Sequence, residues 1–257
     1  MTIRKVTHLS TAHTRYDIRI FIKLCSSLAT HGYNVSLVVA DNLGDEVKNG
    51  VSIIDVGAKT SGRFFRMTTS VKKVFEKAKE LDSDIYHFHD SELIPTGLKL
   101  KNLGKKVIFD IHENIDLQIL EKNWIPLIFR KLISYIYRKY EDYVCKKYDL
   151  LIVPQEAMYK KYNKLSKTIV ISNFPKKTNK LNLKLKKLNK YNLLYSGAIS
   201  ESRGLFNMLN LIEELNLIDN KYRLTLAGII SLDLLEKSKL HKGWKHTEYL
   251  GFLTKEE

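Results

Sequence analysis

The sequence predicts an α/β protein with two doubly wound units, each a mostly parallel sheet with helices on both faces. Short β-rich segments alternate with amphipathic helical segments along most of the chain, and this alternation is typical of βαβ units. It stops after residues 173–175 and then resumes, which indicates a second unit. A chain of 257 residues, 44% of them hydrophobic, can bury one large core or two modest cores without disulfides or a structural metal.

The first unit is expected to contain seven strands. They are short runs rich in β-branched and aromatic residues, at 4–9, 34–40, 51–56, 84–88, 106–110, 150–153 and 168–171. Helical patterns lie between most of them. In residues 17–30, apolar side chains recur at spacings of three and four, and the pattern ends at His31 and Gly32, which suit a helix C-terminus.

The second unit is expected to be smaller. Its strands are predicted at 192–196, 222–227 and 248–251, and its helices at 205–217 and 232–240. Three strands are fewer than the ~5–6 of a typical sheet, so this unit is expected to be incomplete. The predicted organisation is an N-terminal domain at 1–175, a basic linker at 176–190 and a partial C-terminal domain at 191–257.

The net charge of +15 is unevenly distributed along the chain. Residues 1–175 carry a net +9, residues 176–190 carry seven lysines and no acid, and residues 191–257 carry a net −1. Such a balance suits an anionic partner. The excess consists of 34 Lys against 9 Arg, without an Arg cluster for base recognition or a known nucleic-acid module. No nucleic-acid partner is therefore expected, and the lysine-rich segment suits a solvated linker.

The sequence predicts a cytoplasmic location. Cys25 and Cys145 stand alone without CxxC spacing, which favours a reducing compartment. The N-terminus lacks the apolar region of a signal peptide, and no apolar run approaches the ~20 residues that a spanning helix needs.

Residues 124–140 (WIPLIFRKLISYIYRKY) combine four cations, no acid and five aromatic residues. Ile125, Ile128, Phe129, Leu132 and Ile136 form a helical stripe, with the cations largely away from it. One interpretation is an interfacial helix on an anionic membrane, which would make the protein peripheral. The other is an amphipathic helix that packs on the sheet and exposes a basic face.

Polar side chains follow three of the predicted strands. The loops are 10–19, 87–92 and 110–114, each with histidine and carboxylate residues. Ligands of open α/β sheets collect at the carboxyl ends of strands, so the three loops together predict a site. Imidazoles and carboxylates suit recognition and deprotonation of hydroxyl groups. A zinc site from His87, His89 and His112 is disfavoured, because no cysteine or fourth ligand accompanies them.

The second unit contains a candidate phosphate loop at 195–204 (YSGAISESRG). Gly197 would let a phosphate approach the backbone, the following helix N-terminus would supply N–H groups, and Arg203 could pair with a diphosphate. The alternative is an ordinary strand-to-helix turn with a solvated arginine.

The whole pattern resembles retaining glycosyltransferases of the family 4 type with the GT-B architecture, particularly bacterial enzymes that build surface polysaccharides. The matching stretches, in family order, are HTRYDIRIFIKLCSSLATHGYNVSLVV, YHFHDSELIP, VIFDIHEN, LLIVPQEAM, VISNFP, LLYSGAISESRGL, LTLAG and EYLGFLTKEE. The resemblance implies an N-terminal acceptor domain, a C-terminal nucleotide-sugar domain and catalysis in the cleft between them.

The resemblance also implies roles for individual residues. It makes His112 the cleft histidine and Glu113 its acidic neighbour, both counted as catalytic candidates. The acceptor side is expected to include His89, Asp90, Asp17 and Arg19. The donor diphosphate is expected at Gly197, Arg203 and Gly204. Ala198 stands where relatives often have a second cation, so phosphate binding would depend more on Arg203.

The expected function is therefore that of a hexosyltransferase of O-antigen or capsule synthesis. It would move a sugar from a nucleotide diphosphate sugar to a hydroxyl of a lipid-linked glycan, without a metal or other cofactor. The paired-glutamate motif that holds the donor in the family is missing from the sequence, so we expect either a C-terminally truncated fragment of a longer enzyme or an inactive remnant. The alternative function is therefore that of a non-catalytic remnant that binds acceptor or membrane. A nucleotide-sugar epimerase or hydrolase is a third, weaker option.

Overall fold

The structure, a computed structural model, describes residues 4–57, 66–122, 124–175 and 189–253. The chain divides into two compact units, Met1–Lys176 and Lys177–Glu257. The division lies beside the predicted domain end at residue 175. Most of the predicted linker, residues 176–188, lies outside the described residues.

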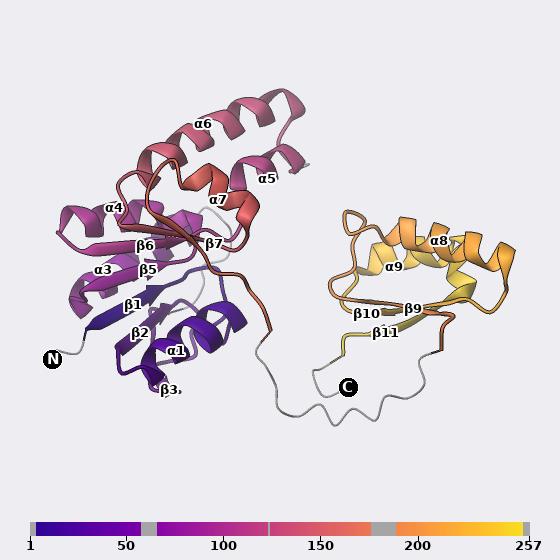
Figure 1. Ribbon diagram of the computed structural model, residues 1–257, viewed down its shortest axis with the longest axis horizontal. Coiled ribbons are helices and arrows are strands. Elements are labelled where there is room, and N and C mark those ends of the chain that lie inside the picture. Colours follow the sequence, from indigo (N-terminus) through magenta and orange to yellow (C-terminus); the bar gives the residue numbers. More distant parts are fainter. Residues whose placement is uncertain (1–3, 58–65, 123, 176–188, 254–257) are drawn as a thin grey trace. The chain divides into compact units, whose positions relative to one another are not determined.

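Unit 1 is built on an eight-stranded sheet (Figure 1). Its spatial order is β3-β4-β2-β1-β5-β6-β7-β8, and every neighbouring pair is parallel except β3 with β4. The strands are β1 (Lys5–Leu9), β2 (Asn34–Val39), β3 (Glu46–Lys48), β4 (Val51–Asp55), β5 (Ile85–Phe88), β6 (Lys106–Asp110), β7 (Leu150–Val153) and β8 (Thr168–Val170). The predicted α/β fold with a mostly parallel sheet is confirmed.

The helices of unit 1 follow the strands as βαβ alternation requires. They are α1 (Ser26–Thr30), α3 (Val71–Leu81), α4 (Ile94–Asn102), α5 (Ile115–Glu121), α6 (Leu127–Cys145) and α7 (Glu156–Tyr162). Ile18–Cys25 and Arg66–Ser70 are π-helical turns, and Ser91–Leu93 is a 3₁₀ turn. The helix expected at 17–30 is thus present, but it begins as a π-helical segment. Asp17 starts it by accepting hydrogen bonds from the backbone N–H of Arg19 and Ile20.

Strand β3 is absent from the sequence-based prediction. It pairs with β4 across a turn in which Asn49 and Gly50 both have positive φ, at 52° and 74°. Asn-Gly is a strong signal for a two-residue hairpin turn, because both residues tolerate this conformation. The short, exposed β3 (Glu46–Lys48) did not carry an apolar pattern of its own.

Both faces of the sheet are covered, and β2 shows this residue by residue. Leu37 and Val39 pack into one buried cluster with Phe21 and Ile53, while Val38 packs into the other. Strands buried on both faces are apolar at successive positions, unlike the alternating strands of a half-exposed sheet. The cores thereby hold the carboxyl ends of β1, β5 and β6 side by side.

Unit 2 is a three-stranded parallel sheet of order β11-β10-β9 (Figure 1). Its elements are β9 (Asn192–Ser196), α8 (Leu205–Ile218), β10 (Arg223–Ala227), α9 (Leu232–Lys239), a 3₁₀ turn (Lys242–His246) and β11 (Thr247–Gly251). The core is formed by Leu205, Leu209 and Ile212 of α8 against Leu224 and Leu226 of β10. The second βα series predicted from the sequence is confirmed.

Candidate functional site

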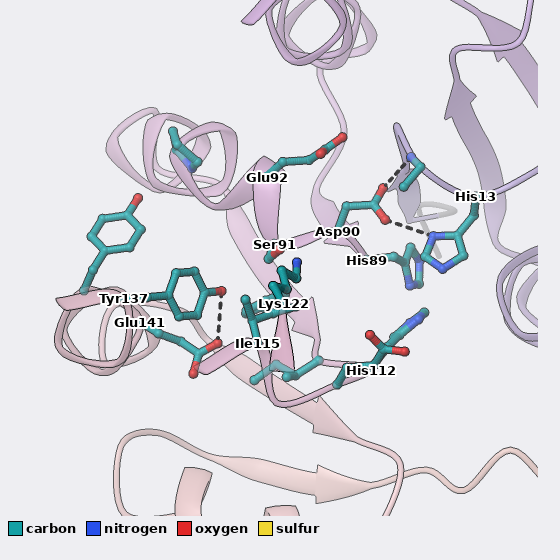
Figure 2. A pocket seen from close by; sticks show the side chains of 16 residues that line it. His13, His89, Asp90, Ser91, Glu92, His112, Ile115, Lys122, Tyr137 and Glu141 are labelled. Atoms are coloured by element: carbon teal, nitrogen blue, oxygen red, sulfur yellow. Dashed lines mark hydrogen bonds and ion pairs between the residues drawn. The ribbon is translucent and has the colours of Figure 1, made fainter. Parts of the chain in front are cut away.

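A cavity of about 600 Å³ lies in unit 1 at the carboxyl ends of β5 and β6. Its polar side chains come from the three loops that the sequence singled out, from α6 and, for Lys122, from the end of α5. These residues are His13, His89, Asp90, Ser91, Glu92, His112, Glu113, Lys122, Tyr137, Tyr140 and Glu141. Figure 2 shows His13, His89 and His112 on one side of the cavity and Tyr137 and Glu141 on the other.

Asp90 ties the loop after β1 to the loop after β5. Its carboxylate pairs with His13 Nδ1 at 2.9 Å and accepts hydrogen bonds from the backbone N–H of Thr11 at 2.6 Å and of Ala12 at 3.1 Å (Figure 2). Burial alone would raise the pKa of Asp90. The pairing with His13 and the hydrogen bonds from the Thr11 and Ala12 backbone lower it by more, so the pKa of Asp90 lies below its ordinary value. Asp90 is therefore an anion that fixes the cavity wall.

Asp110, the last residue of β6, is the centre of a second network. It is fully buried and forms a two-point ion pair with Arg19, in which Nε donates to Oδ2 at 3.0 Å and Nη2 donates to Oδ1 at 2.7 Å. Oδ2 also lies 3.2 Å from Nδ1 of His89 and 3.1 Å from Nε2 of His112. One carboxylate thus holds a cation and two imidazoles.

The Asp110 network sets the proton on His112. Burial raises the pKa of Asp110, but hydrogen bonds from His112, His89 and Arg19 outweigh it and hold the pKa well below the usual range. Because the carboxylate can only accept, Nε2 of His112 carries the hydrogen, and Nδ1 keeps a lone pair. The His112 side chain is 20% exposed and lines the cavity, where that lone pair can meet a hydroxyl group.

The far end of the cavity contains a buried acid, Glu141 of α6. It accepts a hydrogen bond from Tyr162 at 2.8 Å and from Tyr137 at 3.3 Å, and it pairs with Lys161 at 3.3 Å. Lys161 also pairs with Asp116. Burial raises the pKa of Glu141, and the lysine and the tyrosine hydroxyl offset only part of that rise.

We expect Glu141 to make stability depend on pH. Because its folded-state pKa is raised, the folded chain binds more protons than the unfolded chain between the ordinary value, ~4.3, and the raised pKa. Stability should fall as pH rises through this window and then level off. Urea unfolding at several pH values should show that the unfolding free energy of the wild type, relative to that of Glu141→Gln, falls as pH rises through this window. Parallel curves for the two proteins would contradict the prediction.

Unit 2 has a smaller cavity, of about 300 Å³, at the ends of β9 and β10. Gly197 and Gly228 line it, and both have positive φ, 149° and 148°. The two backbones touch so closely that a Cβ on Gly228 would lie 1.7 Å from the carbonyl oxygen of Gly197. Gly204, with φ of 81°, precedes the N-terminus of α8. Backbone without side chains lets a phosphate approach closely, and a helix N-terminus can offer N–H groups to it.

The comparisons with known proteins agree with this arrangement. Residues 19–174, more than half of the chain, match the model of Glycosyltransferase Family 4. The chain belongs to this family. The match includes the cavity lining of unit 1 from His89 to Glu141. No curated protein sequence matches the chain.

Solved structures show that this family 4 chain has the GT-B fold. Sucrose-phosphate synthase from Thermosynechococcus elongatus is similar with a TM-score of 0.65 at 15% identity, over 97% of this chain and 71% of that chain. Anabaena HepE, in complex with UDP and glucose, is similar with a TM-score of 0.63 at 13% identity, over 98% of this chain and 70% of that chain. UDP-N-acetylglucosamine 2-epimerase from Rickettsia bellii is similar with a TM-score of 0.55 at 17% identity, over 96% of this chain and 68% of that chain.

The structure brings together most of the unit 1 residues singled out from the sequence. His89, Asp90, His112 and Glu113 all line the cavity. Asp17 and Arg19 do not: Asp17 caps the π-helical turn, and Arg19 is 7% exposed and bound to Asp110. An acceptor contact by Asp17 or Arg19 therefore stays a prediction.

The unit 2 residues are separated in the structure. Gly197 lines the cavity, whereas Arg203 and Gly204 lie in the exposed turn before α8 and do not line it. Their roles as diphosphate ligands stay predictions. The arrangement leaves the backbone of Gly197 and Gly228 as the part of this segment that reaches the cavity.

Several residues of the two cavities were missed at the sequence level. Asp110 does not line either cavity; it belonged to the predicted loop 110–114, but its role as the centre of the His89–His112–Arg19 network was not predicted. Gly228 is the last residue of the LTLAG stretch and follows the end of β10, so its position at a strand end was the available signal. Tyr137 and Glu141 gave no signal, because α6 brings them to the cavity from a helix that reads as amphipathic and basic.

Proposed function

We propose that this chain transfers a sugar, a hexose in the simplest case, from a nucleotide diphosphate sugar to a hydroxyl of a lipid-linked glycan in bacterial surface polysaccharide synthesis, with retention. Membership of Glycosyltransferase Family 4 supports the reaction class. The observation that carries the proposal is that the imidazole of His112 lines the cavity while its Nε2 is held 3.1 Å from Asp110. The transfer itself requires no metal or other cofactor.

The unit 1 cavity is the proposed acceptor site. The Nδ1 lone pair of His112 accepts the hydrogen of the reacting hydroxyl, and Arg19 and Asp110 keep the ring in place. Glu92 and Glu113 supply carboxylates for neighbouring hydroxyls of the acceptor sugar. A cavity with this lining fits a hydroxyl-rich sugar ring.

The unit 2 cavity is the proposed donor diphosphate site. Gly197 and Gly228 present backbone without side chains, and α8 begins nearby in the chain at Leu205, where the positive end of the helix dipole favours an anion. Arg203, in the turn before α8, would offset charge on the departing diphosphate. The structural likeness to HepE, which was solved with UDP and glucose, supports a nucleotide-sugar donor.

We expect Gly228→Ala to abolish nucleotide binding. The new methyl group would overlap the carbonyl oxygen of Gly197, so the floor of the donor cavity must shift. Isothermal titration with nucleoside diphosphates should show binding to the wild type and none to Gly228→Ala. Gly104→Ala, at a positive-φ turn with open space around the position, is the matched control and should bind normally. Equal binding by all three proteins would refute the donor site.

Helix α6 is the proposed membrane contact. The helix starts at Leu127, and residues 124–126 lie outside it. Pro126 precedes the first turn because proline has no backbone N–H and its ring would clash with a preceding helical turn. Of the stripe predicted from the sequence, Ile125 is buried, whereas Ile128 and Phe129 are 80% and 52% exposed. The exposed apolar side chains on α6 also include Leu127, Leu132, Ile133 and Ile136.

The exposed surface of α6 also carries positive charge from Lys131, Arg138 and Lys139. Apolar side chains flanked by cations suit an anionic bilayer surface, where each cation adds ~1 kcal/mol. None of the described helices has the length and apolarity to cross a bilayer. We therefore propose peripheral attachment at the inner face of the cell membrane, next to a lipid-linked acceptor.

We expect the chain to sediment with vesicles that contain phosphatidylglycerol, and less as salt rises. Ile128→Glu should weaken this binding at least ~tenfold, because burial of an isoleucine contributes ~1.5–3 kcal/mol. Leu217→Glu, at an equally exposed position on α8, is the control and should have little effect. Equal binding to neutral and anionic vesicles, or equal loss in both variants, would count against the membrane contact.

An epimerase is the second candidate function, because UDP-N-acetylglucosamine 2-epimerases have the same fold. The two reactions differ in their second substrate, since an epimerase acts on the nucleotide sugar alone. The family match favours transfer. Incubation with UDP-N-acetylglucosamine without an acceptor should therefore leave the sugar configuration unchanged.

A further inference from the structure

Three buried histidines lie together beside the unit 1 cavity. His8 is on β1, His87 is on β5 and His89 follows β5, and His8 and His87 are register partners of the parallel pair. The ring centroids of His87 are 4.5 Å from those of both His8 and His89. All three side chains are nearly inaccessible to solvent.

Hydrogen bonds leave two nitrogens of this cluster without partners. Asp110 accepts from Nδ1–H of His89, so Nε2 of His89 keeps a lone pair and accepts from Nδ1–H of His8 at 3.0 Å. Nε2 of His8 is then a buried lone-pair nitrogen with no hydrogen-bond partner among the described residues. Nε2 of His87 likewise forms no hydrogen bond there, although it lies 4.0 Å from Oδ2 of Asp110. Each unsatisfied buried polar atom costs ~1–3 kcal/mol.

The same three rings have the spacing of a metal ligand set. Each offers one nitrogen within 4.8 Å of the other two. Bonds of ~2.0–2.1 Å to a tetrahedral zinc ion place its nitrogen ligands ~3.3 Å apart. Binding therefore requires the rings to turn toward a common point and Nε2 of His89 to give up its hydrogen bond from His8.

Asp110 holds the cluster through His89, and the unit 1 cavity borders it. The carboxylate of Asp110 holds Nδ1–H of His89, which is the carboxylate–histidine arrangement that orients metal-binding imidazoles. Arg19 fixes that carboxylate in turn. His89 also belongs to the cavity lining, so the cluster lies directly behind the cavity wall, although the His89 side chain has no solvent exposure.

We propose that His8, His87 and His89 bind one divalent transition-metal ion of the kind that prefers imidazole, with water as a further ligand. The ion ties β1 to β5 and has a structural role, separate from the sugar transfer. This set differs from the zinc set considered from the sequence, in which His112 took the place of His8. His112 faces the cavity, and its Nε2–H is donated to Asp110.

The test uses the full chain, stripped with a chelator and titrated with Co²⁺ and Zn²⁺. We expect one Co²⁺ per chain with the visible absorption of tetrahedral cobalt, and a higher melting temperature with Zn²⁺. His8→Gln and His87→Gln should each weaken binding by more than the ~10–100-fold that loss of an outer partner costs. His31→Gln, which changes an exposed histidine, is the control and should bind as the wild type does.

Two results would overturn the proposal. One is the absence of stoichiometric binding by the wild type. The other is loss of binding in His112→Gln but not in His8→Gln, which would place the ion on the neighbouring set of His89, Asp110 and His112. If the His8 or His87 variants fail to fold, the X-ray absorption spectrum of the zinc-loaded wild type decides: three imidazole ligands support the proposal, and fewer refute it.

Discussion

Replacement of His112 by alanine is expected to lower kcat for sugar transfer by ~10²–10⁴-fold, the usual contribution of a positioned acid–base group. The variant loses the lone pair that accepts the hydrogen of the acceptor hydroxyl. Its fold should persist, because the His112 side chain is partly exposed and Asp110 keeps Arg19 and His89 as partners. Initial rates with saturating donor and acceptor measure the effect.

The control for His112 is His31→Ala, at an exposed position at the end of α1. It should transfer sugar at the wild-type rate. Circular dichroism of both variants checks that the fold is retained. A folded His112→Ala variant with unchanged kcat would remove this residue from the mechanism and leave the cavity with a binding role alone.

Arg19→Met is expected to destabilise unit 1 by ~3–5 kcal/mol, the cost of leaving one partner of a buried ion pair uncompensated. Asp110 is fully buried, and Arg19 supplies its full positive charge through two hydrogen bonds. The variant also loses the hydrogen bond from Arg19 to the backbone carbonyl of Ile171. Urea unfolding, followed by far-UV circular dichroism, measures the difference in free energy.

Two further variants make the Arg19 measurement specific. Lys77→Met removes an exposed pair with Glu80 and should cost less than ~1 kcal/mol. Arg19→Met combined with Asp110→Asn should be less destabilised than Arg19→Met alone, because the uncompensated charge is gone. If the double variant is the less stable of the two, the cost of Arg19→Met does not come from the buried carboxylate.

Most of the fold could be predicted from the sequence, because apolar strand runs and helical periodicity are both local features of the chain. Strands buried on both faces are apolar runs, and the helix patterns between them place the elements within a few residues of their observed bounds. Strand β3 was missed because its three residues carry no apolar pattern, and Asn49-Gly50 was its only signal. The start of α6 was misplaced, because the stripe from Ile125 onward ignored Pro126.

The site was only partly predictable, for a different reason. Strand ends are local features, so His89, Asp90 and His112 could be grouped from parallel-sheet topology alone. The pairing of Arg19 with Asp110 joins residues far apart in the chain, and Arg19 was expected to contact acceptor instead. Glu141 enters the cavity through the packing of α6, which no spacing in the sequence encodes.

We propose above all that this chain transfers sugar from a nucleotide diphosphate sugar to a lipid-linked glycan. The most direct test incubates the purified chain with radiolabelled nucleotide sugars, one at a time, and a lipid extract of bacterial membranes, and then measures label in the organic phase. We predict lipid-bound label from one donor, lost in His112→Ala and retained in His31→Ala. No label in the lipid from any donor, with a folded chain, would contradict transfer and favour a binding module without catalysis.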